Sequence, residues 1–503
     1  MKLIDKLLDG ITMYRLLLYY LLCLLGAAML LGAFGYVSYS PQSIAATAAY
    51  LTLLCWLLNK LFARAFEAPV NPESSLITAL ILSLIITPQL STQNFIFLSI
   101  VAMLAIGSKY ILVIRKQHIF NPAAIAILLT SLCAGKSASW WVGTTWLLPI
   151  VIAGGLLIVR KIQRFQMVAA FLMTSMLATL AFSLINHTGV GLTVKHIILN
   201  SSLLFLAFVM LTEPLTSPTT RRNQAWYGGL AGLLFPPQLN VLGIYSSPEL
   251  VLAISNVSSY IVSPKAKLLP KLSQKLSWGS ATKDFIFTSD QKFTYKPGQY
   301  MEWTLPHAKA DERGSRRYFT LASSPTEDNI RLGVKFYKEG SSFKRAMRAM
   351  EVGNSMAAGQ LSGDFVLPKD SSKKLVFIAG GIGITPFRSM LKYLTDTYDV
   401  RPVTLLYSER NPEAAAYHDV INDAGRQLGT KTVYTFTDMN LPDDNIRKGR
   451  IDSALIATEV PDYLECLFYI SGPHPMVSAI KADLKNLGVK DQNIKIDFFP
   501  GYA

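Results

Sequence analysis

A glycine-rich segment in the last third of the chain has the residue types that hold a dinucleotide. An apolar run over residues 375–379 leads into Gly380-Gly-Ile-Gly-Ile-Thr-Pro386, and a helical pattern follows. Glycines let backbone amides approach a pyrophosphate closely, and the N-terminus of a helix adds a partial positive charge there. The segment therefore predicts a site for a dinucleotide.

A second segment with ligand-binding chemistry is the run Arg317-Tyr-Phe-Thr-Leu-Ala-Ser323. Its arginine can pair with a pyrophosphate, its aromatic residues can stack on a ring system, and its hydroxyls can meet polar edges. Arginine and aromatic residues alternate on many exposed strands, however, so this pattern is weak on its own.

Two polar stretches, residues 107–123 and 210–220, interrupt an otherwise apolar first half. Irregular backbone at membrane depth is tolerated only where protein buries it or where it lines a cavity, and an ionisable residue there is a candidate functional group. The plainer alternative is that Asn121 caps a helix beginning at Pro122 and that Glu213 pairs with Arg221 or Arg222. The candidate site residues in these stretches are Lys109, Phe120, Asn121, Thr212, Glu213, Thr216 and Ser217.

The elements that must position these segments differ between the two halves. Short alternating runs between residues 283 and 367, separated by Pro and Gly turns, predict a small antiparallel barrel. Strand patterns at 374–380, 403–407, 432–436 and 467–471 alternate with helices and predict a doubly wound parallel sheet. The predicted domains are a membrane domain (1–263), a basic linker (264–278), a barrel (279–370) and a dinucleotide-binding domain (371–503).

The distribution of charge supports this division. The 503 residues are 51% hydrophobic and 16% charged, with a net charge of +15. Residues 1–263 contain 15 Lys and Arg with 6 Asp and Glu, whereas residues 264–503 contain 33 and 27. This excludes a disordered, collagen-like or single-domain soluble protein. The basic residues of the first half form short clusters between apolar stretches, which argues against a nucleic-acid partner.

The apolar stretches of the first half predict about ten membrane spans. A cytoplasmic N-terminus places every basic cluster on the inside, so both termini and the second half are predicted to be cytoplasmic, at the cell (inner) membrane. Four lysines in the linker 264–278 would lie against anionic lipid headgroups. The predicted spans run near 12–36, 43–63, 74–88, 93–114, 120–137, 141–159, 166–186, 197–215, 226–244 and 247–263.

The residues available for metal or acid–base chemistry are few. The first half has only His118, His187 and His196, all at loop edges, so paired-histidine haem sites are not expected. Its cysteines are scattered without metal-ligand spacing, and no metal site is predicted. No constellation for acid–base catalysis is present, which fits chemistry carried by cofactors.

The second half resembles the ferredoxin–NADP reductase superfamily over about residues 279–503. The motifs that carry the resemblance keep the family's order and spacing. They are Pro297-Gly-Gln, Arg317-x-Phe-Thr-x-Ala-Ser, Gly359-x-x-x-Gly-x-Phe365, Gly380-Gly-Ile-Gly-Ile-Thr-Pro386, Ser471-Gly-Pro and Asp497-Phe-Phe-Pro-Gly-Tyr502.

The resemblance implies roles for individual residues. FAD would be held by Arg317, Phe319, Thr320, Ser323, Gly340, Ser341 and Ser342, with Phe319 standing where tyrosine is usual. NADH or NADPH would be held by Gly380, Gly381, Gly383, Thr385, Pro386, Gly472 and Pro473. Ser471, in place of a frequent cysteine, would lie near the nicotinamide, and Phe499 or Tyr502 would cover the flavin ring. Ser408 and Arg410 could meet a 2′-phosphate that Glu409 would repel, so the choice between NADH and NADPH stays open.

The first half resembles the flavin-bearing membrane proteins of the sodium-pumping NADH:quinone oxidoreductase and of the Rnf complex. His118-Ile-Phe-Asn-Pro-Ala123 and Met210–Tyr227 carry this resemblance. It implies ten spans and a second flavin. The family's Ser-Gly-Ala-Thr motif for covalent FMN is missing, and residues 134–146 stand in its place. We therefore expect a non-covalent second flavin, FMN or riboflavin.

Together these features predict a membrane-embedded, FAD-dependent NAD(P)H dehydrogenase. Electrons would pass from NAD(P)H through FAD to the membrane flavin, and then to an extracytoplasmic flavin or haem protein or to quinone. Three alternatives stay open. The spans could merely anchor a reductase with a cytoplasmic acceptor, redox could drive ion movement with Glu213 as the acid in mid-domain, or the membrane half could carry a flavin or another solute.

Overall fold

The computed structural model describes residues 8, 11–68, 72–115, 117–187, 189–241, 243–263, 267–279, 281–291, 293–308, 310–311, 313–337, 340–438 and 447–497. The chain divides into two compact units, Met1–Lys267 and Leu268–Ala503.

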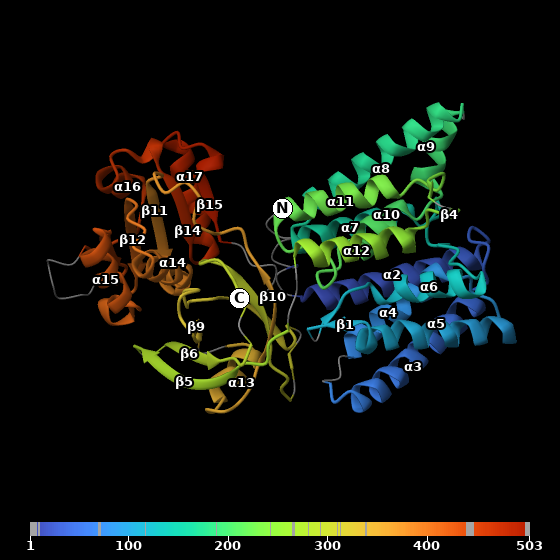
Figure 1. Cartoon of the computed structure of the whole chain (residues 1–503), viewed down its shortest axis with the longest axis horizontal. Helices are drawn as coiled ribbons and strands as arrows, with labels where there is room; N and C mark the ends of the chain where they lie inside the picture. Colours follow the sequence, from blue (N-terminus) through green and yellow to red (C-terminus); the bar gives the residue numbers. More distant parts are fainter. Residues whose placement is uncertain are drawn as a thin grey trace. The chain divides into compact units, whose positions relative to one another are not determined.

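The first unit is helical (Figure 1). Its longer helices match the apolar stretches of the sequence, and two short hairpins connect some of them. The elements are α2 (Met13–Ala33), α3 (Pro41–Ala65), α4 (Pro72–Ile85), α5 (Thr92–Ile111), β1 (Val113–Ile114), β2 (Gln117–His118), α6 (Pro122–Ala134), α7 (Leu148–Ile162), α8 (Phe165–Ile185), α9 (Val190–Leu199), α10 (Leu203–Phe205), the π-helical turn η1 (Leu206–Met210), α11 (Arg221–Leu234), β3 (Asn240–Val241), β4 (Ile244–Tyr245) and α12 (Pro248–Val262).

Three of these helices begin with a polar capping residue followed by proline. Ser40, Asn121 and Ser247 precede α3, α6 and α12, and each side chain accepts a hydrogen bond from the backbone amide three residues further on. Proline at the first helical position lacks the amide hydrogen that would have no partner there. The local sequence therefore fixes where these helices start.

Four of the described helices, α2, α3, α5 and α8, are long and apolar enough to cross a membrane. A fifth span results if α9 and the segment Leu203–Met210, which are bent by 52°, form one broken span. Helices α4, α6 and α12 are apolar but shorter. These helices indicate a membrane protein, whereas the ten-span topology stays a prediction.

Helices α8 and α11 run alongside each other (Figure 1) and pack closely through glycines. A Cβ added to Gly228 would lie 2.2 Å from the Met167 carbonyl oxygen, and one added to Gly232 would lie 2.5 Å from the Phe171 carbonyl oxygen. Small residues let helix backbones approach in a membrane, where lipid offers no hydrophobic driving force.

The second unit starts with two three-stranded antiparallel sheets of order β5-β6-β9 and β10-β7-β8. Bridges at Leu268–Ala358 and Lys271–Ser355 connect them, and they share one hydrophobic core. The antiparallel prediction is confirmed, while closure into one six-stranded barrel stays a prediction. The elements are β5 (Lys271–Trp278), β6 (Thr282–Thr288), β7 (Tyr300–Thr304), β8 (Arg316–Thr320), β9 (Ile330–Lys335), α13 (Ser342–Ala349) and β10 (Ala357–Ser362).

The structure differs from the expected linker over residues 271–278, which form strand β5. This strand pairs with β6 along its whole length, and Leu272 is buried in the core of the two sheets. A register shift between Leu272 and Gln274 breaks the regular alternation, and most residues of the strand are polar. The strand pattern is therefore hidden in the sequence.

The rest of the second unit is a five-stranded parallel sheet of order β13-β12-β11-β14-β15 with helices on its faces (Figure 1). The predicted doubly wound sheet is confirmed. The strand order reverses between β11 and β14, which is the position where such sheets bind ligands. The elements are β11 (Leu375–Gly380), η2 (Gly381–Ile384), α14 (Thr385–Asp396), β12 (Val403–Glu409), η3 (Pro412–Ala414), α15 (His418–Leu428), β13 (Lys431–Phe436), α16 (Ser453–Glu459), η4 (Tyr463–Glu465), β14 (Leu467–Ser471), α17 (His474–Asn486), η5 (Asp491–Asn493) and β15 (Ile494–Ile496).

Candidate functional site

The carboxyl ends of β11 and β14 lie side by side, because these strands are paired in parallel. The chain turns away through Gly381–Ile384 after β11 and through Gly472-Pro473 after β14. A Cβ added to Gly383 would lie 2.4 Å from the Ser471 carbonyl oxygen and 2.6 Å from the Gly472 nitrogen. Only glycine allows this approach, so the two turns pack against each other at the point where the strand order reverses. Doubly wound sheets bind ligands in a crevice beyond the strand ends at this point, and we refer to this place as the glycine-lined crevice.

The glycine-rich turn leads directly into the N-terminus of α14. Gly381 has φ of +56°, a conformation that favours glycine. Thr385 opens the helix and donates a hydrogen bond through its hydroxyl to the Ile382 carbonyl at 3.1 Å. The structure thus brings the predicted NAD(P) residues to one edge of the sheet, namely Gly380, Gly381, Gly383, Thr385, Pro386, Gly472 and Pro473.

A serine–carboxyl pair closes the far side of this crevice. The Ser471 hydroxyl donates to Asp497 Oδ2 at 3.1 Å, and burial raises the pKa of the Asp497 carboxyl to about 7. Ser471 itself is buried. The sequence singled out Ser471 but not Asp497 as a site residue. Phe499 and Tyr502, which were predicted to cover the flavin ring, lie outside the described residues.

An ion pair lies beside Gly381. The Lys335 ammonium donates to both carboxylate oxygens of Glu409, at 3.1 and 3.3 Å, and Glu409 Oε2 also accepts from the Arg410 amide at 2.8 Å. A Cβ on Gly381 would lie 3.5 Å from both Glu409 Oε1 and Lys335 Nζ. Glu409 therefore lies at the predicted dinucleotide turn with its charge balanced by strand β9.

Strand β8 carries Arg317 and Phe319 on one face, against Phe343 of α13. The Arg317 guanidinium lies 5.2 Å from the centre of the Phe343 ring, and the two phenylalanine rings are 6.0 Å apart. Arg317 Nη1 donates to the carbonyl oxygens of Arg313 and Arg316, both at 2.6 Å. These contacts hold the arginine beside the N-terminus of α13.

Positive charge gathers at this end of α13. Burial, together with the positive charges of Arg317 and Arg313, lowers the pKa of Lys344 to about 8. Asp311 is the acid within the group: partial burial would raise the pKa of its carboxyl, but the hydrogen bond from the Ser342 amide at 2.8 Å and the neighbouring arginines lower it. Three cations with a helix N-terminus are a donor set that suits a pyrophosphate.

The other predicted FAD residues lie around the same strand and helix. Ser341 caps α13 through the Lys344 amide at 3.2 Å, and the Gly340 carbonyl accepts from Arg345 at 2.6 Å. Thr320 is buried at the end of β8. Ser323 is fully buried, and its hydroxyl accepts from the Arg331 amide at 3.1 Å.

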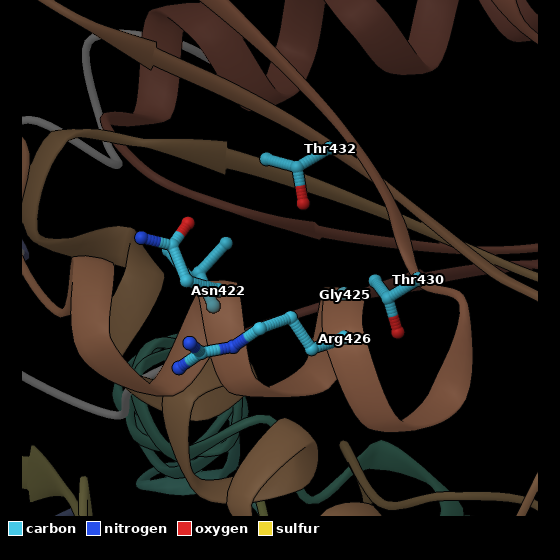
Figure 2. A pocket seen from close by; sticks show the side chains of 6 residues that line it. Asn422, Gly425, Arg426, Thr430 and Thr432 are labelled. Atoms are coloured by element: carbon cyan, nitrogen blue, oxygen red, sulfur yellow. The ribbon is translucent and has the colours of Figure 1, made fainter.

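Figure 2 shows a hollow elsewhere on the dinucleotide-binding part, between α15 and the start of β13. Asn422, Arg426, Thr430 and Thr432 line it. It lies at the amino end of β13, whereas ligands of parallel sheets bind beyond the carboxyl ends of the strands. It is therefore separate from the glycine-lined crevice.

In the helical unit, the two polar stretches meet at Glu213. Its Oε2 accepts from Asn121 Nδ2 at 2.9 Å and from the Thr216 hydroxyl at 3.1 Å, and His118 Nε2 lies 3.8 Å from Oε1. Asn121 Oδ1 also accepts from the Ala124 amide at 3.1 Å, as the capping alternative predicted. One side chain thus performs both roles, and segments 92 residues apart form a single polar cluster.

Helix α12 extends this cluster. Asn256 Oδ1 accepts from the backbone N–H of Asn121 at 2.9 Å, and Asn256 Nδ2 donates to the Tyr227 hydroxyl at 3.0 Å. Within the described part of the chain, four polar atoms on α12 and β2 are buried without a hydrogen-bond partner: Ser255 Oγ, Ser259 Oγ, Gln117 Nε2 and His118 Nε2. Buried polar groups are normally paired, so these atoms suit a polar ligand.

The remaining membrane candidates have other contacts. Lys109 donates to the Ser74 carbonyl and to the Thr78 hydroxyl of α4, at 3.0 and 2.9 Å. The Thr212 hydroxyl donates to the Phe208 carbonyl at 2.7 Å, and Ser217 accepts from Arg164. Phe120 is half-buried directly before Asn121.

Sequence reasoning missed a buried acid in this unit. Glu249, in the first turn of α12, is 3% exposed and accepts from Trp140 Nε1 at 2.7 Å. An acid in the first turn of a helix is typical of a solvent-exposed start, which hides this role. The signal that could have found it is that the acid and the tryptophan both border apolar spans.

Family models match both halves of the chain. Residues 129–239 match the NQR2, RnfD, RnfE family, and residues 377–482 match the oxidoreductase NAD-binding domain. The two sequence resemblances are thereby confirmed. The chain thus joins a region similar to the NQR2, RnfD, RnfE family to a region similar to the oxidoreductase NAD-binding domain.

Curated relatives match parts of the chain. A flavohemoprotein of Candida albicans is 28% identical over 211 residues, which cover 41% of this chain and 51% of that protein. A flavohemoprotein of Rhodopirellula baltica is 24% identical over 298 residues, covering 52% and 72%. The chain thus spans about half the length of the first of these relatives.

Solved structures also match parts of the chain. The flavohem-like FAD/NAD-binding domain of a Vibrio cholerae nitric oxide dioxygenase has 20% identity and a TM-score of 0.42, over 46% of this chain and 98% of that one. The cytochrome b5 reductase domain of Ulva prolifera nitrate reductase has 21% identity and a TM-score of 0.41, over 46% and 97%.

Proposed function

We propose that this protein is a membrane-embedded NAD(P)H dehydrogenase. Electrons pass from cytosolic NAD(P)H through FAD to a second, non-covalently bound flavin in the helical unit, and on to an extracytoplasmic flavin or haem protein or to quinone. The observation that carries this proposal is the presence, in one chain, of a glycine-lined dinucleotide crevice and a buried polar cluster at Asn121 and Glu213 in a region of the NQR2, RnfD, RnfE family.

The dinucleotide-binding domain, 371–503, supplies the nicotinamide site. The amides of Gly381–Ile384 and the N-terminus of α14 bind the pyrophosphate, and the close approach at Gly383 leaves space only for backbone. The Ser471 hydroxyl and Asp497 border the crevice on the β14 side. The bound nicotinamide and flavin supply the hydride and single-electron chemistry, so the protein's task is to orient them and exclude water.

The FAD-binding domain, 279–370, holds the flavin cofactor. Arg317, Lys344 and the N-terminus of α13 supply the positive charge for its pyrophosphate. Phe319 packs along the cofactor, while Thr320 and Ser323 offer polar groups to the ring edge. This assignment agrees with the face that Arg317 and Phe319 share on β8.

In the membrane domain, 1–263, the second flavin lies at the cluster formed by Asn121, Glu213, Thr216 and Asn256. Amide, carboxylate and hydroxyl groups are the partners that the polar edge of a flavin ring needs, and the buried hydroxyls of Ser255 and Ser259 add two more. Both termini and the reductase domains lie on the cytoplasmic side, where the basic loop clusters are.

Anaerobic addition of NADH, and separately NADPH, to the purified chain tests the proposal. We expect the visible absorbance of bound flavin to bleach, as it does with dithionite. Bleaching by dithionite but by neither nicotinamide would contradict the proposed reaction.

The alternative of a membrane-anchored reductase with a cytoplasmic acceptor predicts FAD as the sole flavin. A redox-linked ion or solute transporter predicts movement of ions or solute with NADH oxidation. Counting bound flavins separates the first alternative from the proposal.

A further inference from the structure

Within the second unit, one buried contact joins the dinucleotide-binding sheet to the antiparallel sheets. Tyr417 immediately precedes α15, and its hydroxyl donates to Asp284 Oδ1 of β6 at 2.5 Å. Both residues are fully buried, although 133 residues separate them in sequence. A hydrogen bond to a buried carboxylate is among the stronger polar contacts in proteins.

Asp284 has two further polar partners, and Tyr417 has two ring contacts of its own. Trp278 Nε1 donates to Oδ2 at 3.2 Å, and Arg331 Nη1 lies 3.5 Å from the same oxygen. The Trp278 ring also packs edge-on against Tyr417, and the Arg388 guanidinium lies 5.7 Å from the centre of the tyrosine ring. Burial raises the pKa of Asp284, against the opposing effects of Tyr417 and Arg331.

The tyrosine adopts a costly backbone conformation to make this contact. Tyr417 has φ of +66°, in the left-handed region that a bulky residue rarely occupies. Such strain persists only where surrounding contacts fix it, and it points to a constraint at that position.

The contact lies in a notch at Gly333, which is directly opposite Asp284 in the β6–β9 register. A Cβ on Gly333 would lie 2.3 Å from the Tyr417 hydroxyl, 2.7 Å from Thr385 Cγ2 and 3.2 Å from Ile382 Cδ1. Ile382 and Thr385 belong to the glycine-rich turn and the first turn of α14. The notch therefore seats both the tyrosine and the predicted dinucleotide turn on the flavin-binding domain.

Helix α14 is attached to the flavin motif on its other side. The Ser389 hydroxyl donates to the Ser323 carbonyl at 2.6 Å, and Arg388 donates to the Ala322 carbonyl at 2.8 Å and to Glu327 Oε1 at 2.9 Å. The dinucleotide turn is thus fixed between two attachments, and the Tyr417–Asp284 contact is the one adjacent to the turn itself.

We propose that Tyr417 and Asp284 are positioning residues for hydride transfer. Their hydrogen bond, seated in the notch at Gly333, sets the distance and angle between the dinucleotide turn and the flavin-binding domain. The inference rests on the proposed function, because it concerns the geometry of transfer from nicotinamide to FAD. A displacement of about 1 Å at a reacting centre can cost about a hundredfold in rate.

The test is anaerobic stopped-flow reduction of FAD in the full-length, flavin-loaded chain over a range of NADH concentrations. Tyr417→Phe removes only the hydroxyl. We expect its limiting reduction rate to fall about tenfold or more, with NADH affinity and FAD content close to those of the wild type. Tyr434→Phe is the matched control, since the Tyr434 hydroxyl contacts His418 at 3.3 Å within the dinucleotide-binding domain. It should react at the wild-type rate.

A second variant covers the case in which Tyr417→Phe does not hold FAD. Gly333→Ala keeps both polar groups but pushes a methyl against Tyr417 and Thr385, so it should show the same slow limiting rate. If the contact is purely structural, both variants will have lower thermal stability but a wild-type limiting rate. That result would overturn the inference. If the wild-type chain itself shows no NADH-driven reduction, the proposed function fails instead.

Discussion

At Gly383 the backbone of one turn meets the backbone of another, and no side chain fits between them. Gly383→Ala places a methyl 2.4 Å from the Ser471 carbonyl oxygen, so the turn must move. We expect NADH-driven flavin reduction to fall by about a hundredfold, because the pyrophosphate loses its backbone donors. Bound FAD should be retained, since its site lies on other elements.

The matched control for this variant is Gly425→Ala in α15, where the nearest atom to the added methyl is the Thr430 carbonyl oxygen at 3.6 Å. Stopped-flow reduction and flavin extraction measure both variants. Wild-type reduction rates in Gly383→Ala would refute the assignment of the crevice.

Asp497 is expected to make the stability of the folded protein depend on pH. Its carboxyl titrates with a pKa of about 7 in the folded protein, above the unfolded value of about 3.9. The folded state therefore binds more protons between these values, and stability falls as the pH rises from about 4 to 7. Asp497→Asn removes this penalty while keeping an oxygen for the Ser471 hydroxyl.

We expect Asp497→Asn to stabilise the flavin-loaded chain at pH 8.5 by roughly 1–3 kcal/mol, and by much less at pH 4.5. Thermal release of flavin fluorescence at the two pH values measures the difference. Asp290→Asn, in an exposed bend, is the control. An equal effect of Asp497→Asn at both pH values would show that burial does not raise the pKa of this carboxyl.

Individual residues were predictable from sequence to different degrees. Gly383 follows from a local motif, because strand, glycine turn and helix are contiguous. The partners Asn121 and Glu213 are 92 residues apart, and Tyr417 and Asp284 are 133 apart. Such pairs depend on tertiary packing, which no local pattern encodes.

At the scale of elements, the start of α6 performs two tasks. Asn121 caps the helix with its oxygen and binds Glu213 with its amide nitrogen. Asn121→Ser separates the two, because serine is also a good capping residue but lacks the amide donor. We expect the variant to fold and keep FAD but to lose most of the second flavin.

Flavin extraction followed by chromatographic separation of FAD, FMN and riboflavin gives this result directly. Asn186→Ser, the same substitution at an exposed asparagine at the end of α8, serves as the control and should keep both flavins. Full retention of the second flavin in Asn121→Ser would place that flavin elsewhere in the helical unit.

The elements that the sequence predicted well have strong hydrophobic periodicity or clear start and stop residues. The parallel sheet follows from apolar strands, two of which end in glycine turns, and the start of α6 follows from a capping residue before proline. Strand β5 was missed because its bulge and its lysines conceal the alternation. Helices such as α4 and α6 are apolar but short, so their number as membrane spans does not follow from hydropathy alone.

At the scale of the whole molecule, the contrast in charge between residues 1–263 and 264–503 reflects a unit rich in apolar helices followed by a unit with the composition of a soluble protein. The sparse charges of the helical unit include the half-buried Glu213 and the buried Glu249, each hydrogen-bonded to a side-chain donor. The charges of the second unit include the cations at α13 and the ion pair at Glu409. The cations at α13 thus lie where the FAD pyrophosphate is proposed to bind.

The central claim is that NADH delivers electrons through FAD to a second flavin in the helical unit. The most direct test counts the flavins of the purified full-length chain and titrates them anaerobically with NADH. The account predicts FAD and a second, acid-extractable flavin in equal amounts, both bleached by NADH, with the second lost in Asn121→Ser. A single FAD per chain that accepts all the electrons would contradict it.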